Sequence, residues 1–230
     1  EVLKLVQAKV PAAQRNTLSA FILRYYGQVD PEDLADRAPA DLYGAALSHW
    51  NFARRRDPAH VRVRAFNPSI EEHGWQSTHT IIEIVNDDMP CLVDSVTMEV
   101  NRHGLTLHLI IHPIVAVVRE AEGTLIGVAD DAEGAQRESM IHVEVDRVGD
   151  PAKLDELASD VARVLGDVRA AVEDWKKMRE RVGTILAEND QRAPPLPADE
   201  LAEGRAFLSW LADEHFTFLG YRRHDLVTIE

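Results

Sequence analysis

The sequence contains a single cysteine, Cys91, among 230 residues. One cysteine can form neither a disulfide bond within the chain nor a cysteine-based zinc cage, so both kinds of site are excluded. Long apolar runs are also missing, because no stretch approaches the roughly 20 residues that a membrane-spanning helix needs. The start, EVLKLVQAKV, lacks both an initiator methionine and the basic-then-apolar pattern of a secretory signal. We expect a soluble cytoplasmic fragment.

Positive charge is scarce as well. The formal net charge is −14, from 25 Lys and Arg against 39 Asp and Glu. Residues 1–75 hold ten basic and nine acidic side chains, so the imbalance lies in residues 76–230, which hold the other 15 and 30. An acidic surface repels phosphate backbones and anionic lipid headgroups. We therefore expect neither nucleic acid nor a membrane as a partner.

A loop that could cradle phosphates is missing too. The glycine-containing stretch from Gly123 to Gly127 lacks the G-x-G-x-x-G spacing and opens no helix. The pair Asp94-Ser95 is not surrounded by the G-x-S-x-G sequence of a nucleophile elbow. We expect no catalytic residue in this chain and no nicotinamide cofactor bound by it.

Three segments are present along the chain. Residues 1–75 form an N-terminal helical segment, in which Leu18, Phe21 and Tyr25 recur at helical spacing and a short strand precedes Asn67. Residues 76–174 show the alternation of a half-buried sheet and form the central domain. Residues 175–230 contain linker helices, a proline-rich connection and the closing sequence HFTFLGYRRHDL, which alternates like a strand and would begin the next module.

The central segment alternates strands with helices. Apolar residues alternate with polar ones near 105–112 and again near 139–147, and the polar positions are expected on a solvated outer face. One helix spans about 90–103 and ends at Gly104, a residue type that favours the left-handed conformation after a helix. A second helix spans about 151–165. Residues 168–172 fit a fourth strand, and a continuing helix is a nearly equal alternative.

The stretch from His79 to His112 reads HTIIEIVNDDMPCLVDSVTMEVNRHGLTLHLIIH. It resembles the N-terminal region of the large NAD-specific bacterial glutamate dehydrogenases, and its order of elements is similar to that of an ACT regulatory domain. The resemblance implies an α/β fold: an ACT-like (ferredoxin-like βαββαβ) sandwich with an N-terminal helical segment and C-terminal linking helices.

The same resemblance implies a non-catalytic regulatory and oligomerisation module of a dehydrogenase that converts glutamate and NAD to 2-oxoglutarate and ammonia. NAD would bind elsewhere in the full-length enzyme. The implied partners are the rest of the same polypeptide, further copies of the chain and an amino-acid effector. Two other functions stay open: a free-standing amino-acid sensor and a purely structural self-association module.

The candidate ligand-binding site is the turn before the first helix of this stretch. Its residues are Asn86, Asp87, Asp88, Met89, Pro90, Cys91 and Leu92. The start of a helix favours a bound carboxylate, and ACT domains use this place for an amino acid. Cys91 stands where ACT domains usually have glycine, and its Cβ would obstruct the ligand. We expect Asp87 and Asp88 mainly to cap the helix, with ligand binding and a subunit contact as alternatives.

Three histidines suggest a metal site. His108 and His112 lie four residues apart on one expected strand, and His142 lies on a neighbouring one. Three imidazoles within reach of one another could bind zinc. Their spacing matches no recognised zinc motif, so we interpret them as solvated or interface histidines and expect no metal.

Overall fold

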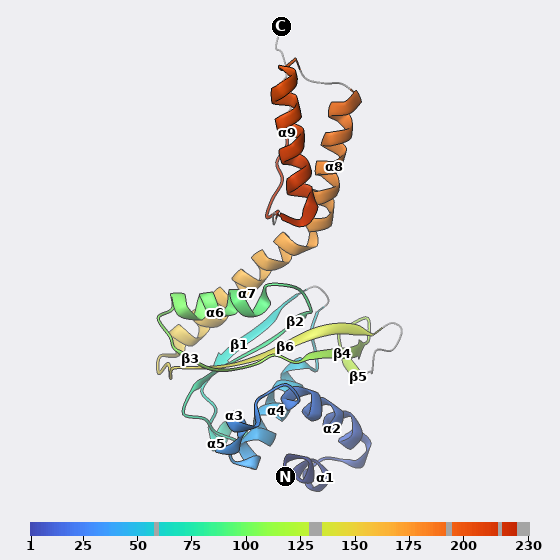
Figure 1. Cartoon of the computed structure of the whole chain (residues 1–230). Coiled ribbons are helices and arrows are strands. Elements are labelled where there is room, and N and C mark those ends of the chain that lie inside the picture. The colour runs from blue at the N-terminus through green and yellow to red at the C-terminus, as the bar shows by residue number, and fades with distance from the viewer. Residues whose placement is uncertain (58–59, 129–134, 192–194, 216–217, 225–230) are drawn as a thin grey trace. The chain divides into compact units, whose positions relative to one another are not determined.

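The computed structural model describes residues 1–57, 60–128, 135–191, 195–215 and 218–224 (Figure 1). They form two compact units, Glu1–Gly166 and Asp167–Glu230, and the division falls inside one helix, α7 (Pro151–Glu173). None of the helices in these ranges combines the length and the apolar character that crossing a membrane requires. The first unit is an α/β sandwich, as the sequence predicts.

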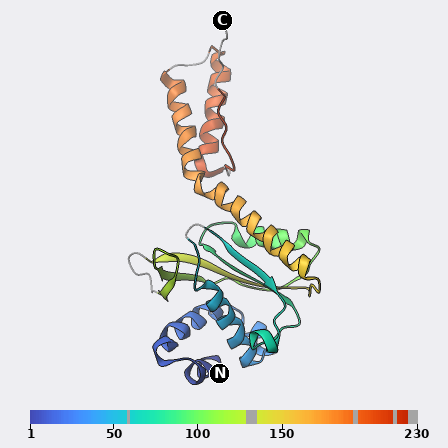
Figure 2. The ribbon, with the colours of Figure 1, turned by 180° about the vertical axis from the view of Figure 1, so that it is seen from behind.

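The first unit is built on one antiparallel sheet. Its strands are β1 (Arg62–Phe66), β2 (Thr80–Asp87), β3 (Leu107–Ile111), β4 (Ile114–Arg119), β5 (Leu125–Val128) and β6 (Gln136–Val145). Their order is β1-β2-β6-β4-β5, and β3 pairs with the same edge of β6 as β4, farther along that strand. Figures 1 and 2 show helices on both faces of this sheet.

N-terminal helices cover one face. They are α1 (Val2–Lys9), α2 (Ala12–Tyr26), α3 (Pro31–Ala35) and α4 (Pro39–Ala53), and the short α5 (Ile70–His73) follows β1. The expected helical stripe is confirmed, because Leu18, Phe21 and Tyr25 are buried. Asp30 accepts a hydrogen bond from the backbone N–H of Glu32 and so caps α3, as expected from a helix that begins with proline.

Two helices, α6 (Leu92–Arg102) and α7, cover the other face. Val96 and Val100 of α6 and Leu157 and Val161 of α7 are buried, each pair at helical spacing. The predicted end of α6 is confirmed. Gly104 has φ 69°, and the N–H groups of Gly104 and the next residue bond back to carbonyls of the last helical turn, which is the Schellman arrangement.

The strand that closes the sheet differs from the βαββαβ expectation. Residues 168–172 continue α7 as helix, which was the alternative that the sequence left open, and Ala170 and Ala171 favour that state. The edge beside β2 is instead occupied by β1, whose Arg62 lies opposite Val85 in an antiparallel register. The edge strand next to β2 is therefore β1, which comes before the ACT-like segment in the chain.

The compact units differ from the three predicted segments 1–75, 76–174 and 175–230. One hydrophobic core contains Phe21 and Tyr25 of α2 together with Leu109 and Ile111 of β3 and Met140 of β6. A boundary at residue 75 would cut through this core and separate β1 from β2. The N-terminal helices are thus part of the first unit, because they cover apolar positions of the sheet that would otherwise face water.

On β6 the face predicted to be solvated is buried, so the expectation was wrong there, whereas Thr106 and His108 at the β3 side are exposed as expected. Glu83, Glu138, His142 and Glu144 occupy alternate positions on β2 and β6, and each is at most 2% exposed. Alternation of polar and apolar residues usually marks one solvated face. Here the polar face lies under the N-terminal helices, and buried or half-buried arginines supply partners for the acids.

The second unit contains α8 (Trp175–Gln191), α9 (Ala198–Trp210) and a π-helix at Leu211–His215. The linker helices expected in residues 175–230 are thus present. The closing strand is not confirmed: residues 218–224 are not in a strand, His215 ends the π-helix, and the rest of HFTFLGYRRHDL lies outside the described residues. A strand needs a neighbour for its backbone groups, and no described strand lies in this unit.

Candidate functional site

The predicted ligand-binding turn connects β2 to α6. Its residues are buried at Asn86 and Leu92, half-buried at Asp87, Asp88 and Met89, and exposed at Pro90 and Cys91. The turn itself runs from Asp88 to Cys91, and α6 begins at Leu92. The strand–turn–helix order predicted from the sequence is therefore confirmed at this place.

Asp88 does not cap α6, contrary to expectation, and both aspartates of the turn form ion pairs with arginines. Asp87 forms an ion pair with the Nη2 atom of Arg56. Asp88 accepts hydrogen bonds from Arg137 Nε and Ser139 Oγ, both at 3.2 Å. The turn lies beside β6, so Asp88 finds its partners on that strand, whereas Asp87 pairs with the buried Arg56 that follows α4. Their negative charge is offset, which weakens the repulsion expected against a ligand carboxylate.

Cys91 adopts a conformation that suits glycine. Its φ is 66°, in the left-handed region, and no other residue except glycine has a positive φ among those described. It is the N-cap residue of α6, and its side chain makes no capping hydrogen bond. The backbone thus keeps the form that an ACT glycine would take, while a Cβ occupies the approach to the helix start.

Beneath the turn, a buried ion-pair network joins the sheet to the end of α4. Glu138 Oε1 accepts hydrogen bonds from Arg56 Nε at 3.0 Å and from Arg119 Nε at 2.7 Å. Arg119 also donates to the carbonyl of Ala53, the last residue of α4, at 2.9 Å. The side chains of Arg56, Arg119 and Glu138 are 1%, 4% and 0% exposed, so the three charges depend on one another.

A second buried group centres on His49 of α4. Its Nε2 lies 3.1 Å from the carbonyl oxygen of Ile84, so this nitrogen must donate. The other nitrogen, Nδ1, then accepts from the hydroxyl of Tyr25 at 3.0 Å. Burial lowers the pKa of His49 to about 4. The imidazole is therefore neutral near pH 7 and serves as a connector between α2, α4 and β2.

A cavity of about 620 Å³ lies between α3, α4 and the end of β6. Arg37 donates from Nη1 and Nη2 to the two carboxylate oxygens of Glu144, at 2.5 and 2.9 Å. Burial raises the pKa of Glu144, but hydrogen bonds from His142 and Arg37 outweigh it and hold the pKa at about 2. Asp33 and Asp41 add negative charge to the lining, so the cavity is acidic.

The three histidines considered as zinc ligands take three different partners. His108 bonds to Asp146 at 2.7 Å, and His112 bonds to Ser139 at 3.0 Å. His142 lies beneath the N-terminal helices, 3.5 Å from Glu144, and is 1% exposed. The interpretation of His142 as a solvated or interface residue was therefore wrong, because helices cover that face.

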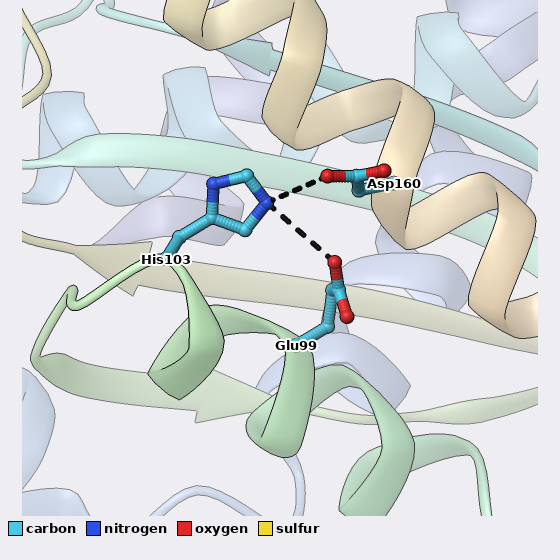
Figure 3. A group of neighbouring side chains, drawn as sticks. All are labelled: Glu99, His103 and Asp160. Carbon is cyan, nitrogen blue, oxygen red and sulfur yellow. Dashed lines mark hydrogen bonds and ion pairs between the residues drawn. The ribbon is translucent and has the colours of Figure 1, made fainter.

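A different group brings possible metal ligands together. Among the residues that the structure describes, Glu99, His103 and Asp160 offer one ligand atom each within 4.8 Å of one another. Figure 3 shows Glu99 and His103 projecting from α6 toward Asp160 of α7. Arg102 binds the same carboxylates, and its hydrogen bonds lower the pKa of Glu99, although burial opposes that shift.

Sequence reasoning missed this group and the buried arginines for different reasons. Glu99 and His103 lie four residues apart on a helix that was predicted, so their shared face could have been read from the sequence. Their meeting with Asp160 depends on how two helices pack, which spacing does not give. The partners of Glu138 come from residues 56 and 119, and no local pattern indicates such pairs.

The chain is similar to known glutamate dehydrogenases. The family model described as glutamate dehydrogenase, ACT1 domain, matches residues 21–161. The NAD-specific glutamate dehydrogenase of Halomonas elongata is 42% identical over 226 residues, which is 96% of this chain and 14% of that protein. The enzyme of the same name from Pseudomonas aeruginosa is 37% identical over 207 residues. The one from Mycobacterium tuberculosis is 26% identical over 216 residues.

These relatives are far longer than the chain. The matched part is 89% of this chain for both the Pseudomonas and the Mycobacterium proteins, but only 13% of each of them. The chain thus spans about one seventh of the length of the curated relatives it matches. The family model includes most of the first unit and stops inside α7.

Proposed function

The chain belongs to the family described as glutamate dehydrogenase, ACT1 domain, and we propose that it is the N-terminal, non-catalytic regulatory and assembly module of a large NAD-specific glutamate dehydrogenase. The remainder of that polypeptide would bind NAD and convert glutamate to 2-oxoglutarate and ammonia in the cytoplasm. In this proposal the present chain binds an effector, a second copy or both.

The observation that carries the proposal is the β2–turn–α6 unit. The N-terminus of α6 faces the turn without a capping side chain from Cys91, and a helix start attracts carboxylates through its free N–H groups and its dipole. Asp87 and Asp88 are engaged by Arg56 and Arg137. An amino-acid effector could therefore place its carboxylate at residues 88–92, with the Cβ of Cys91 limiting how closely it approaches.

The ion pairs of the first unit support a role other than catalysis. Glu138 and Glu144 are each bound by arginine, and His49 is neutral and has hydrogen-bond partners on both nitrogens. A general acid or base must reach a substrate proton, whereas these groups are engaged inside the core. Such an arrangement suits a module that responds by changing its packing or its contacts.

Self-association is the second part of the proposal. One edge of β3 pairs with β6, and among the described strands none pairs with its other edge. An unpaired strand edge can pair with the same edge of another copy, which would extend the sheet across two chains. A purely structural module would show this association without any response to amino acids.

The test uses the 230-residue chain and the whole enzyme side by side. Glutamate and NAD added to the chain alone should give no NADH. Each proteinogenic amino acid is then titrated against both proteins, with the melting temperature of the chain and the rate of the enzyme as readouts. One amino acid should stabilise the chain saturably and change the rate of the enzyme, with ~2.7 kcal/mol of stabilisation at about 100 times its Kd.

Cys91→Gly gives this test a matched variant. Removing the Cβ at φ 66° should strengthen binding of the same amino acid, whereas Gly104→Ala at the other end of α6 should leave its affinity unchanged. If no amino acid binds but the native mass shows self-association, the module is structural only. NADH formation by the chain alone would contradict the proposal as a whole.

A further inference from the structure

Three side chains on the helical layer outside the sheet converge at one point (Figure 3). Glu99 and His103 lie one turn apart on α6, and Asp160 faces them from α7. We propose that Glu99, His103 and Asp160 bind one divalent transition-metal ion, with Zn²⁺ the best match. This site lies at the C-terminal end of α6, away from the turn before its N-terminus, and does not depend on the function proposed above.

The distances fit a single ion. Three ligand atoms at about 2.1 Å from a tetrahedral zinc ion lie roughly 3.4 Å from one another. His103 Nε2 lies 3.5 Å from Glu99 Oε1 and 3.1 Å from Asp160 Oδ2. All three ligand atoms are within 4.8 Å of one another. Small side-chain rotations would thus complete the coordination, and water would take the fourth position.

The donor set selects the class of ion. One imidazole nitrogen and two carboxylate oxygens suit zinc and its first-row neighbours, whereas calcium and magnesium prefer oxygen ligands alone. Two carboxylates balance the two charges of the ion. The side chains of Glu99, His103 and Asp160 are 6%, 16% and 24% exposed, so the ion would be partly shielded from water and still reachable from solvent.

Arginine competes with the ion for the same oxygens. Arg102 donates from Nε to Glu99 at 3.0 Å and from Nη2 to Asp160 at 2.6 Å. Arg163 lies 3.4 Å from Asp160. Arg102 also donates from Nη2 to Glu99 at 2.5 Å, so a metal ion must displace a guanidinium held by two carboxylates. The side chain of Arg102 is 56% exposed, which leaves it room to turn toward solvent when a metal ion binds.

Binding would tie α6 to α7 through one residue pair of α6 and one residue of α7. An ion that binds the folded chain and not the unfolded one raises the stability of the folded state by linkage. The metal would thus stiffen the helical layer that covers one face of the sheet. The gain in stability should extend to the whole first unit, because both helices bury apolar residues against its sheet.

The first experiment measures Zn²⁺ and Co²⁺ binding to the 230-residue chain carrying Cys91→Ser, which removes the thiol as a ligand. We expect one ion per chain, a higher melting temperature with Zn²⁺, and the visible absorption of four-coordinate Co²⁺. His103→Ala and Asp160→Asn should each weaken binding by at least about 10–100-fold, the range known for losing even an outer partner of a metal ligand. Asp155→Asn, an exposed acid on the same helix, is the matched control and should bind as the parent does.

Arg102→Ala separates a metal site from a set of ion pairs. Removing the competing guanidinium should tighten Zn²⁺ binding and enlarge the rise in melting temperature. Equal affinity in the parent, His103→Ala and Asp160→Asn chains would overturn the proposal, as would absence of binding in the parent and in Arg102→Ala.

Discussion

The two faces of the sheet in the first unit are both covered by helices, but the buried side chains on these faces differ in chemistry. On the face beneath α6 and α7, every second residue of β2 and β6 points toward the helices, and most of these residues are apolar. The helix residues that pack on them are mostly apolar too. The opposite face carries buried acids that pair with arginines. Arg64 pairs with Glu83, Arg56 and Arg119 pair with Glu138, and Arg37 pairs with Glu144.

This difference separates two kinds of stability. An apolar layer is non-directional and tolerates exchange of side chains of similar volume. A buried ion pair is directional, and loss of one partner leaves the other charge without compensation. The face under the N-terminal helices should therefore be much less tolerant of substitution than the face under α6 and α7, and it should also depend on pH.

The largest effect is expected from Glu138→Gln. The substitution keeps the volume of the side chain but leaves Arg56 and Arg119 without their shared carboxylate, so unfolding should become easier by about 3–5 kcal/mol. Urea titration followed by circular dichroism measures this loss. The adjacent Arg137→Gln, whose side chain is 61% exposed, should cost no more than about 1 kcal/mol. Equal losses in the two variants would show that burial of the network does not matter.

The next effect concerns pH. Burial holds the folded-state pKa of His49 near 4, below its unfolded value of about 6.5. The neutral imidazole therefore contributes stability that is fully present above pH 6.5 and is lost as the pH falls to 4, up to about 3 kcal/mol. His49→Gln should flatten the dependence of unfolding free energy on pH in this window. An unchanged slope in the variant would mean that another group causes the acid sensitivity.

A smaller effect is expected on the apolar face. Leu157 of α7 is 1% exposed, and Leu157→Met nearly conserves its volume. The variant should lose less than about 1.5 kcal/mol, because the flexible thioether chain can fill the same space. Comparison with Glu138→Gln in one urea series tests the contrast between the faces. A loss at Leu157 as large as the loss at Glu138 would remove that contrast.

The smallest effects are expected at the ends of α6. Cys91 and Gly104 have nearly the same φ, 66° and 69°, but only one of them is glycine. Cys91→Gly should stabilise the chain by roughly 0.5–1 kcal/mol, and Gly104→Ala should destabilise it by about 1 kcal/mol. No atom lies within 4 Å of a Cβ added at Gly104, so only the backbone contributes there. Thermal unfolding of both variants should show shifts of opposite sign.

What could be predicted from the sequence was what depends on neighbouring residues. The helix at 92–102, its glycine end and the turn before it follow from local periodicity and backbone preference, and all three are present. The role of Asp88 was predicted wrongly, because its carboxylate bonds to Arg137 and Ser139. Capping is a local preference, whereas the ion pairs of Asp87 with Arg56 and of Asp88 with Arg137 bring distant positions together.

The positions that could not be predicted depend on which elements meet. The alternation along 139–147 correctly predicted which residues of β6 share a face. It did not predict that helices cover both faces. The place of β1 beside β2 and the meeting of His103 with Asp160 likewise depend on packing between elements. A pattern of alternating charge and apolar residues is the same for a solvated face and for a face paired with buried arginines.

The most direct test of the regulatory and assembly role is the native mass and the rate of the whole dehydrogenase, measured with and without this chain across a series of amino-acid concentrations. We predict that the enzyme without the chain still forms NADH from glutamate and NAD, but that its native mass or its response to amino acids changes. An enzyme whose mass and response are both unchanged by the removal would contradict the account, and so would NADH formation by the chain alone.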